Sequence, residues 1–147
     1  MILYTIGFTK KSAEKFFTLI KENGIELLID IRLHNNTQLA GFAKGRDLPY
    51  FLRELCGCDY EHCLNYAPTK ELLDNYRNKI VTWQDYERTF STIMANNNAV
   101  NDFLKRFWGK YDSVCLLCTE ATPEQCHRRL FAEAIALREP SIHIKHL

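Results

Sequence analysis

The stretch SVCLLCTEATPEQCHRRL, residues 113–130, combines a strand signal, a helix signal and several reactive side chains. Its first six residues form the short apolar run that is typical of a strand covered on both faces. Thr122 and Gln125 then have the spacing of a capping box, with Pro123 at the first helical position. The stretch therefore predicts a buried strand followed by a helix that runs to about Arg138.

Outward from this stretch, strand signals alternate with helix signals along the whole chain. Strands are indicated by ILYTIGF (2–8), IELLIDIRL (25–33), more weakly DYEHC (59–63), and SIHIKHL (141–147), which suits a sheet edge. Helices are indicated over 12–24, 47–57, 69–80, 82–95 and 100–109, several behind a Ser, Thr or Asp cap. The alternation predicts a three-layer α/β fold, Rossmann-like or flavodoxin-like, with a mostly parallel sheet of about five strands and helices on both faces.

Length and composition limit the classes of function. At 147 residues we expect a single domain, 1–147. With 19 basic and 18 acidic residues the net charge is +1, which does not support nucleic-acid binding because that usually needs a clear positive excess. No segment approaches the roughly 20 apolar residues of a membrane span, and the N-terminus lacks the charge order of a signal peptide. We therefore expect a cytoplasmic protein whose six cysteines are not disulfides.

The polar and reactive side chains fall at the carboxyl ends of the predicted strands. Ligands of parallel α/β sheets bind at this edge, so we predict that these residues converge on one site. The catalytic candidates are Cys118, Glu120, Cys126 and His127, and the substrate-binding candidates are Gly7, Asp30, Arg32 and Arg128.

For Cys126 we expect a thiol pKa below the ordinary value, and faster alkylation than at Cys56, Cys58 or Cys115. It lies in the predicted first helical turns, where free N–H groups favour an anion, and Arg128 adds positive charge. A packing role beneath the helix is the alternative. His127 can be a base, a proton shuttle or a metal ligand, and Glu120 can hold Arg32, orient His127 or act as a general acid or base.

The substrate-binding candidates also have two interpretations. A buried Asp or Arg must be paired, so Asp30 and Arg32 form either a structural ion pair or a substrate clamp. Arg128 can bind a phosphate or a carboxylate through its planar fork. Gly7 either allows a tight turn or lets a ligand approach the backbone.

The remaining cysteines give weaker signals. Cys115 and Cys118 should point to opposite faces of a strand, so their Cys-x-x-Cys spacing is not expected to chelate a metal, and Cys115 is expected in the core. The cluster CGCDYEHC, 56–63, lacks the spacing of common zinc motifs, and we assign no metal ligands there.

The segments YTIGF, LIDIR, CTEATPEQCHR and the HI near the C-terminus together resemble the domain of unknown function 488 family of bacterial and archaeal proteins. The resemblance spans nearly the whole chain. It implies a compact α/β domain without an established reaction, and its marked positions are the eight assigned above. The chain differs at Phe8, where family members often have His, in LHNNTQ, where they often have Pro-x-Ser, and near CLNYAPT, where they often have a Leu-Gly-Gly turn.

Three functions remain open. The first is an enzyme acting on a phosphorylated or nucleotide-like substrate, in which Arg32 and Arg128 hold the anion, Glu120 or His127 transfers protons, and Cys126 or Cys118 is the nucleophile. The second is a non-catalytic binding or sensing module, whose pocket holds a metabolite or a nucleic-acid end, or in which Cys118, Glu120, Cys126 and His127 hold iron or zinc. The third is a structural domain. The motif is not a Cys-x₅-Arg phosphatase cradle, a Walker loop or a dinucleotide fingerprint, and the sequence identifies no cofactor.

Overall fold

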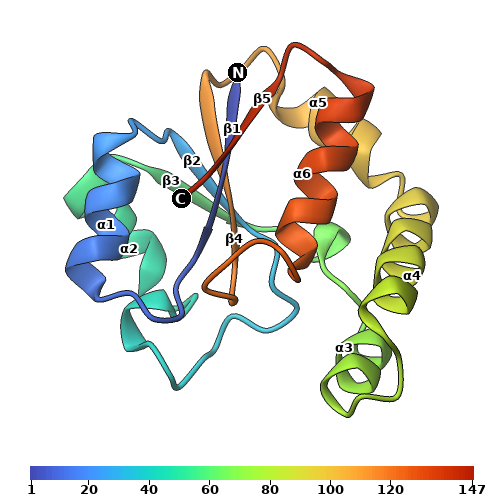
Figure 1. The fold of residues 1–147 in the computed structure, drawn as a ribbon. Coiled ribbons are helices and arrows are strands. Elements are labelled where there is room, and N and C mark those ends of the chain that lie inside the picture. Colours follow the sequence, from blue (N-terminus) through green and yellow to red (C-terminus); the bar gives the residue numbers. More distant parts are fainter.

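The computed structural model describes residues 1–147 and contains one sheet of five parallel strands. These are β1 (Ile2–Gly7), β2 (Leu27–Asp30), β3 (Asp59–His62), β4 (Ser113–Cys118) and β5 (His143–His146). They lie in the order β3-β2-β4-β1-β5 (Figure 1). The predicted α/β fold is confirmed, and β5 is an edge strand as expected.

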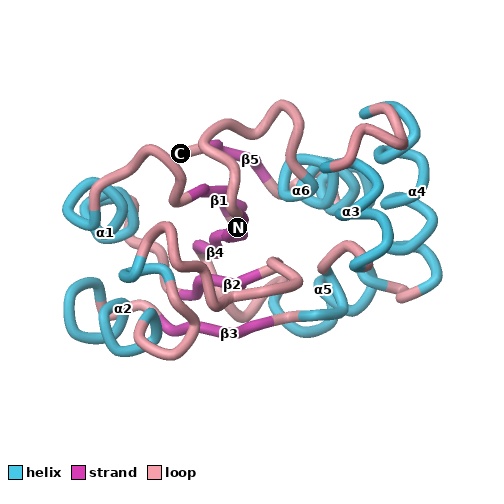
Figure 2. The backbone as a smooth tube through the Cα atoms, turned by 90° about the horizontal axis from the view of Figure 1, so that it is seen from below, coloured by secondary structure: helices cyan, strands magenta, loops and turns pink.

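Helices cover both faces of the sheet (Figure 2). One face carries α1 (Ala13–Glu22) and α2 (Leu48–Cys56), and the other carries α3 (Lys70–Arg77), α4 (Trp83–Asn96), α5 (Ala99–Phe107) and α6 (His127–Arg138). Two 3₁₀ turns, Gly41–Ala43 and Leu64–Tyr66, lie in the connections. No helix combines the length and the apolar character needed to cross a lipid bilayer.

Strand residues alternate between two apolar cores. Leu117 packs with Phe16 in the core beneath α1 and α2, while Leu116 packs with Phe131 in the core beneath α4 to α6. Because side chains alternate along a strand, Cys118 shares the α6 side with Leu116. Cys115 is fully buried in the opposite core, as predicted.

Three of the six α-helices start at a side-chain cap, whereas α2, α5 and α6 have none. Ser12 accepts a hydrogen bond from the N–H of Lys15, and Thr69 accepts one from Leu72. Thr82 forms a complete capping box with Asp85 at the start of α4. These side chains satisfy N–H groups that have no partner inside the helix, which is why the sequence locates the starts well.

The predicted start of the last helix is wrong. We expected Pro123 at the first helical position, but α6 begins at His127, with Cys126 as an N-cap that makes no side-chain cap bond. Arg129 donates from Nε and Nη2 to the carbonyl of Glu124 at 3.1 and 3.0 Å. The Arg129 side chain thus reaches back from α6 and holds the segment before the helix as a turn. The capping-box spacing of Thr122 and Gln125 therefore does not start the helix at Pro123.

Gly7 ends β1 at a point where the segment after β4 passes very close. A Cβ atom at Gly7 would lie 1.6 Å from the carbonyl oxygen of Glu120 and 3.0 Å from Nη1 of Arg128. Gly7 in the strand and the carbonyl of Glu120 both belong to the main chain, so neither can move aside as a flexible side chain could. The close approach at Gly7 is therefore made by the chain's own backbone at Glu120.

We expect Gly7→Ala to lower the free energy of unfolding by about 1–3 kcal/mol, because the added methyl group overpacks this contact. Urea denaturation monitored by circular dichroism measures the change. Gly41→Ala is the matched control, since nothing lies within 4 Å of its added Cβ, and its stability should change by no more than about 0.5 kcal/mol. Equal stabilities of the two variants would contradict the tight contact.

Candidate functional site

The carboxyl ends of β1, β2 and β4 lie side by side. Gly7 pairs with Cys118, and Asp30 pairs with Leu117. The chain leaves β1 and β2 toward α1 and α2, whereas it leaves β4 toward α6 on the other face. Such a change of direction opens a crevice at the strand ends, where α/β proteins bind their ligands. The expected convergence at one sheet edge is therefore present.

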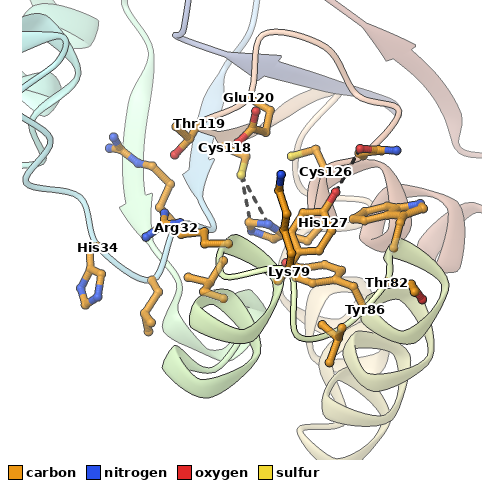
Figure 3. Close-up of a pocket in the computed structure, with 17 residues that line it drawn as sticks. Arg32, His34, Lys79, Thr82, Tyr86, Cys118, Thr119, Glu120, Cys126 and His127 are labelled. Carbon is orange, nitrogen blue, oxygen red and sulfur yellow. Dashed lines mark hydrogen bonds between the residues drawn. The ribbon is translucent and has the colours of Figure 1, made fainter.

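A pocket of about 510 Å³ opens at this edge. One side is formed by Cys118, Thr119, Glu120, Cys126 and His127, from the end of β4 and the start of α6 (Figure 3). The other side consists of residues from α3, from α4 and from the connection between them, and Arg32 and His34 after β2 complete the wall. Every predicted catalytic residue thus lines one pocket.

Cys118 lies beside an imidazole in this pocket. Its Sγ is 3.4 Å from Nδ1 of His127 and 3.6 Å from Nε2 (Figure 3). Nε2 is also 2.9 Å from the carbonyl oxygen of Ile31. A carbonyl only accepts, so Nε2 carries the hydrogen and Nδ1 is the unprotonated nitrogen of neutral His127. The sulfur is nearly equidistant from the two nitrogens and so lies over the face of the ring, which must turn for Nδ1 to accept the thiol proton. A thiol, a base and a group that orients the base are the parts of an activated nucleophile.

Cys118 is the cysteine with the lowered pKa. Burial raises the pKa of this thiol, but hydrogen bonds from the Cys126 thiol and from the backbone N–H groups of Thr119 and Glu120, together with the charge of Arg128, outweigh that effect and lower it. Each of these groups stabilises the thiolate and none stabilises the neutral thiol in the same way. The site therefore favours a thiolate at the end of β4.

Our prediction of a low pKa at Cys126 is wrong. The hydrogen bond that its thiol donates to Cys118 raises the pKa of Cys126, and burial raises it further. The side chain is also buried, with 3% of its area exposed. The free N–H groups at the helix start do not offset these two effects on the pKa of Cys126, because the neighbouring Cys118 has the lower pKa and ionises first.

Arg128 is fully buried and has no carboxylate partner. Its Nη1 donates to the carbonyl of Glu120 at 2.6 Å and lies 3.4 Å from Sγ of Cys126. Its Nε and Nη2 make no hydrogen bond, and Arg128 does not line the pocket. In this structure it acts from beneath the site, where it holds the segment after β4 and lowers the pKa of Cys118.

Asp30 and Arg32 form a buried ion pair with one another. Nε and Nη2 of Arg32 lie 2.8 and 2.6 Å from the two carboxylate oxygens, and the Tyr60 hydroxyl donates to Asp30 at 2.7 Å. The guanidinium also lies over the ring of Phe8, 5.3 Å from its centroid. Asp30 does not reach the pocket, whereas Arg32 lines it and keeps Nη1 without a partner. The structural alternative thus accounts for Asp30.

The Glu120 side chain is exposed at the pocket wall and forms no salt bridge or hydrogen bond, so it neither holds Arg32 nor orients His127. The carbonyl of Ile31 has the orienting role. The remaining role considered for Glu120 is that of a general acid or base, and its position at the pocket wall is compatible with that role.

Sequence reasoning missed the wall formed by α3 and α4. The rings of Trp83 and Tyr86 stack with centroids 5.0 Å apart, and Tyr76 lies 5.1 Å from Tyr86. Arg77 and Lys79 are exposed on the same wall and form no salt bridge. Aromatic residues at helical spacing resemble core positions in the sequence, so nothing local marked them as pocket residues.

Cys118, Cys126 and His127 are close enough to share a metal ion. Their ligand atoms lie within 4.8 Å of one another. In a tetrahedral zinc site, a sulfur and a nitrogen ligand lie about 3.5 Å apart, close to the 3.4 Å between Cys118 and His127. Metal-bound imidazoles usually donate their other N–H to a carbonyl or carboxylate, as His127 does to Ile31. Glu120, expected as a fourth ligand, is not part of this cluster.

Comparison with protein families gives a match to the profile described as "Domain of unknown function DUF488", over residues 12–135. The matched region includes every predicted site residue except Gly7. Comparisons with curated proteins and with solved structures give no match. Since the profile covers most of its length, the chain belongs to the DUF488 family of domains of unknown function.

Proposed function

We propose that the protein is a cysteine-dependent enzyme acting on an anionic small molecule of the phosphorylated or nucleotide-like class. The observation that carries the proposal is the contact of Cys118 with His127 in the pocket, with His127 oriented by the Ile31 carbonyl. A thiolate chemistry of this kind needs reduced cysteines, and all six cysteines are free thiols. We accordingly propose a reducing, cytoplasmic location.

In the proposed reaction the Cys118 thiolate attacks an electrophilic centre of the substrate. Before this attack, Nδ1 of His127 takes the proton of the Cys118 thiol; a bond then forms between sulfur and the substrate as the bond to the leaving group breaks. The proton passes to the leaving group from His127 or from Glu120 at the pocket wall. His127 or Glu120 then takes a proton from water, whose oxygen bonds to the electrophilic centre as the bond to sulfur breaks, so the product leaves and the thiolate is restored.

Two features of the pocket support the substrate class. The half-buried ring of Trp83, stacked on the buried Tyr86, offers a surface for a planar ring, and stacking of a base on an aromatic side chain is worth about 1–3 kcal/mol. Arg77 and Lys79 bring positive charge to the same pocket, where Glu120 is the one carboxylate. A ring that carries a phosphate matches both features.

The first test of the proposal is the reaction of each cysteine with iodoacetamide across pH. Cys118 should react fastest at neutral pH. Its rate should level off below the ordinary thiol pKa of about 8.5, because the pKa of Cys118 is lowered. Below that lowered pKa the rate should fall as the sulfur is protonated. Cleavage after Glu120 and Glu124 separates Cys118 from Cys126 for mass mapping.

Cys126→Ala is the informative variant in this experiment. It removes a hydrogen bond that stabilises the thiolate, so it should slow the reaction of Cys118 at pH 7 but not at pH 10. Cys56→Ala removes a half-buried thiol outside the pocket and should leave the profile unchanged. Cys118 reacting no faster than Cys115 at pH 7 would overturn the proposal.

The second test is protection of Cys118 by adenosine monophosphate. Bound nucleotide should slow alkylation, and Arg77→Ala or Lys79→Ala should each weaken protection about two- to fivefold, the size expected for one exposed ion pair. Lys110→Ala is the control, because Lys110 precedes β4 at the opposite end of the sheet. If Lys110→Ala weakens protection as much as the pocket variants do, or if millimolar adenosine monophosphate does not protect Cys118, the substrate is not nucleotide-like.

A second function, metal binding, is favoured by the Cys118, Cys126 and His127 cluster. Protein purified without chelators should then contain close to one zinc or iron per chain, measured by plasma mass spectrometry. Cys126→Ser should lose most of that metal, whereas Cys56→Ser should retain it. Metal-free protein that takes up no added zinc would exclude this function.

A further inference from the structure

The proposed reaction uses the sulfur of Cys118 and leaves a second sulfur beside it. The Sγ atoms of Cys118 and Cys126 lie within 4.8 Å of one another. Cys118 ends β4 and Cys126 directly precedes α6, and both sulfurs belong to the same buried cluster with His127. Both residues line the pocket, which gives small molecules a route to the pair.

We propose that Cys118 and Cys126 form a redox-active pair that a small hydroperoxide converts into a disulfide. The Cys118 thiolate attacks the peroxide, a sulfur–oxygen bond forms, the oxygen–oxygen bond breaks and an alkoxide or hydroxide leaves. The Cys126 thiol then attacks the sulfenic sulfur, and water leaves as the disulfide forms. The peroxide gains two electrons and the two thiols lose them.

The backbone around the pair is compatible with this closure. A disulfide needs the sulfurs about 2.05 Å apart, so they must approach by no more than about 3 Å. Cys126 has an extended backbone, with φ −139° and ψ 138°, and lies outside the first turn of α6. Residues 119–126 form turns and bends without a helix or strand of their own. Rotation of the two side chains, with a small shift at the Cys126 end of this segment and none at the tight contact of Glu120 with Gly7, therefore brings the sulfurs together without unwinding an element.

The other four cysteines lack this combination. None of them lines the pocket. Cys58 and Cys115 are buried in the core beneath α1 and α2, where burial raises their pKa values, that of Cys58 to about 12. Cys63 is likewise buried, and burial raises its pKa to about 11. Oxidation should therefore be confined to Cys118 and Cys126.

Disulfide formation would remove both the proposed nucleophile and the sulfur ligands of the candidate metal cluster. The pair would also give the protein a second chemistry. In the presence of an external dithiol, the disulfide is reduced and the cycle repeats, so the protein would consume hydroperoxide with turnover. This inference needs only the two thiols and a peroxide, and it does not depend on the proposed substrate.

The test is treatment of reduced protein with hydrogen peroxide at pH 7, followed by thiol blocking and mass mapping. Wild-type protein should lose two hydrogen atoms per chain, and cleavage after Glu120 and Glu124 should leave the peptides of Cys118 and Cys126 linked until dithiothreitol separates them. Cys56→Ser should behave like wild type. In Cys126→Ser, Cys118 should instead gain two oxygen atoms, which dithiothreitol does not remove.

Two results would overturn the inference. One is wild-type Cys118 gaining two oxygen atoms while Cys126 stays a free thiol. The other is oxidation of Cys56 or Cys63 at a rate equal to that of Cys118. Circular dichroism of the variants before treatment shows whether they are folded, and the wild-type measurement decides the question even where a variant is not.

Discussion

The buried guanidinium of Arg128 connects the three segments that meet at the carboxyl edge of the sheet. It rises from α6, bonds the carbonyl of Glu120 after β4, and lies against Gly7 at the end of β1. A buried cation without a carboxylate partner costs several kcal/mol unless another anion offsets it. The sulfur of Cys118 is such an anion once it ionises, and the charge of Arg128 helps to lower the pKa of this thiol. The same guanidinium therefore holds the segment after β4 and favours ionisation of the thiol beside it.

The parts of the fold that the sequence predicts well are those decided within a few residues. Ser12, Thr69 and Thr82 cap the helices that follow them because a side-chain oxygen and a nearby N–H are sufficient. The three central strands, β1, β2 and β4, are recognisable because a parallel sheet covered on both faces requires continuous apolar runs. The strand order was not predictable, since it depends on which long-range pairings form.

The predictions that were wrong or missing concern side chains whose contacts form only in the folded structure. Pro123 does not begin α6, because Arg129 holds the preceding turn from within the helix. Cys126 lacks the low pKa that its helix position suggested, because the neighbouring Cys118 takes the charge. The pocket wall of α3 and α4 could not be predicted either, since spacing alone does not distinguish an aromatic residue in a pocket from one in a core.

The position of this wall has a consequence for how the protein can diversify. Cys118 and His127 are held by the central strands and by a helix packed on them, whereas Arg77, Lys79 and Trp83 belong to a helical hairpin outside that frame (Figure 1). Substitutions in the hairpin change the shape and charge of the wall without disturbing the backbone contacts around Gly7. The proposed reactive centre and the proposed recognition surface can thus evolve separately. Relatives with the same sulfur and imidazole then need not share a ligand, and exchanging residues 70–96 between them is a route to redesigned selectivity.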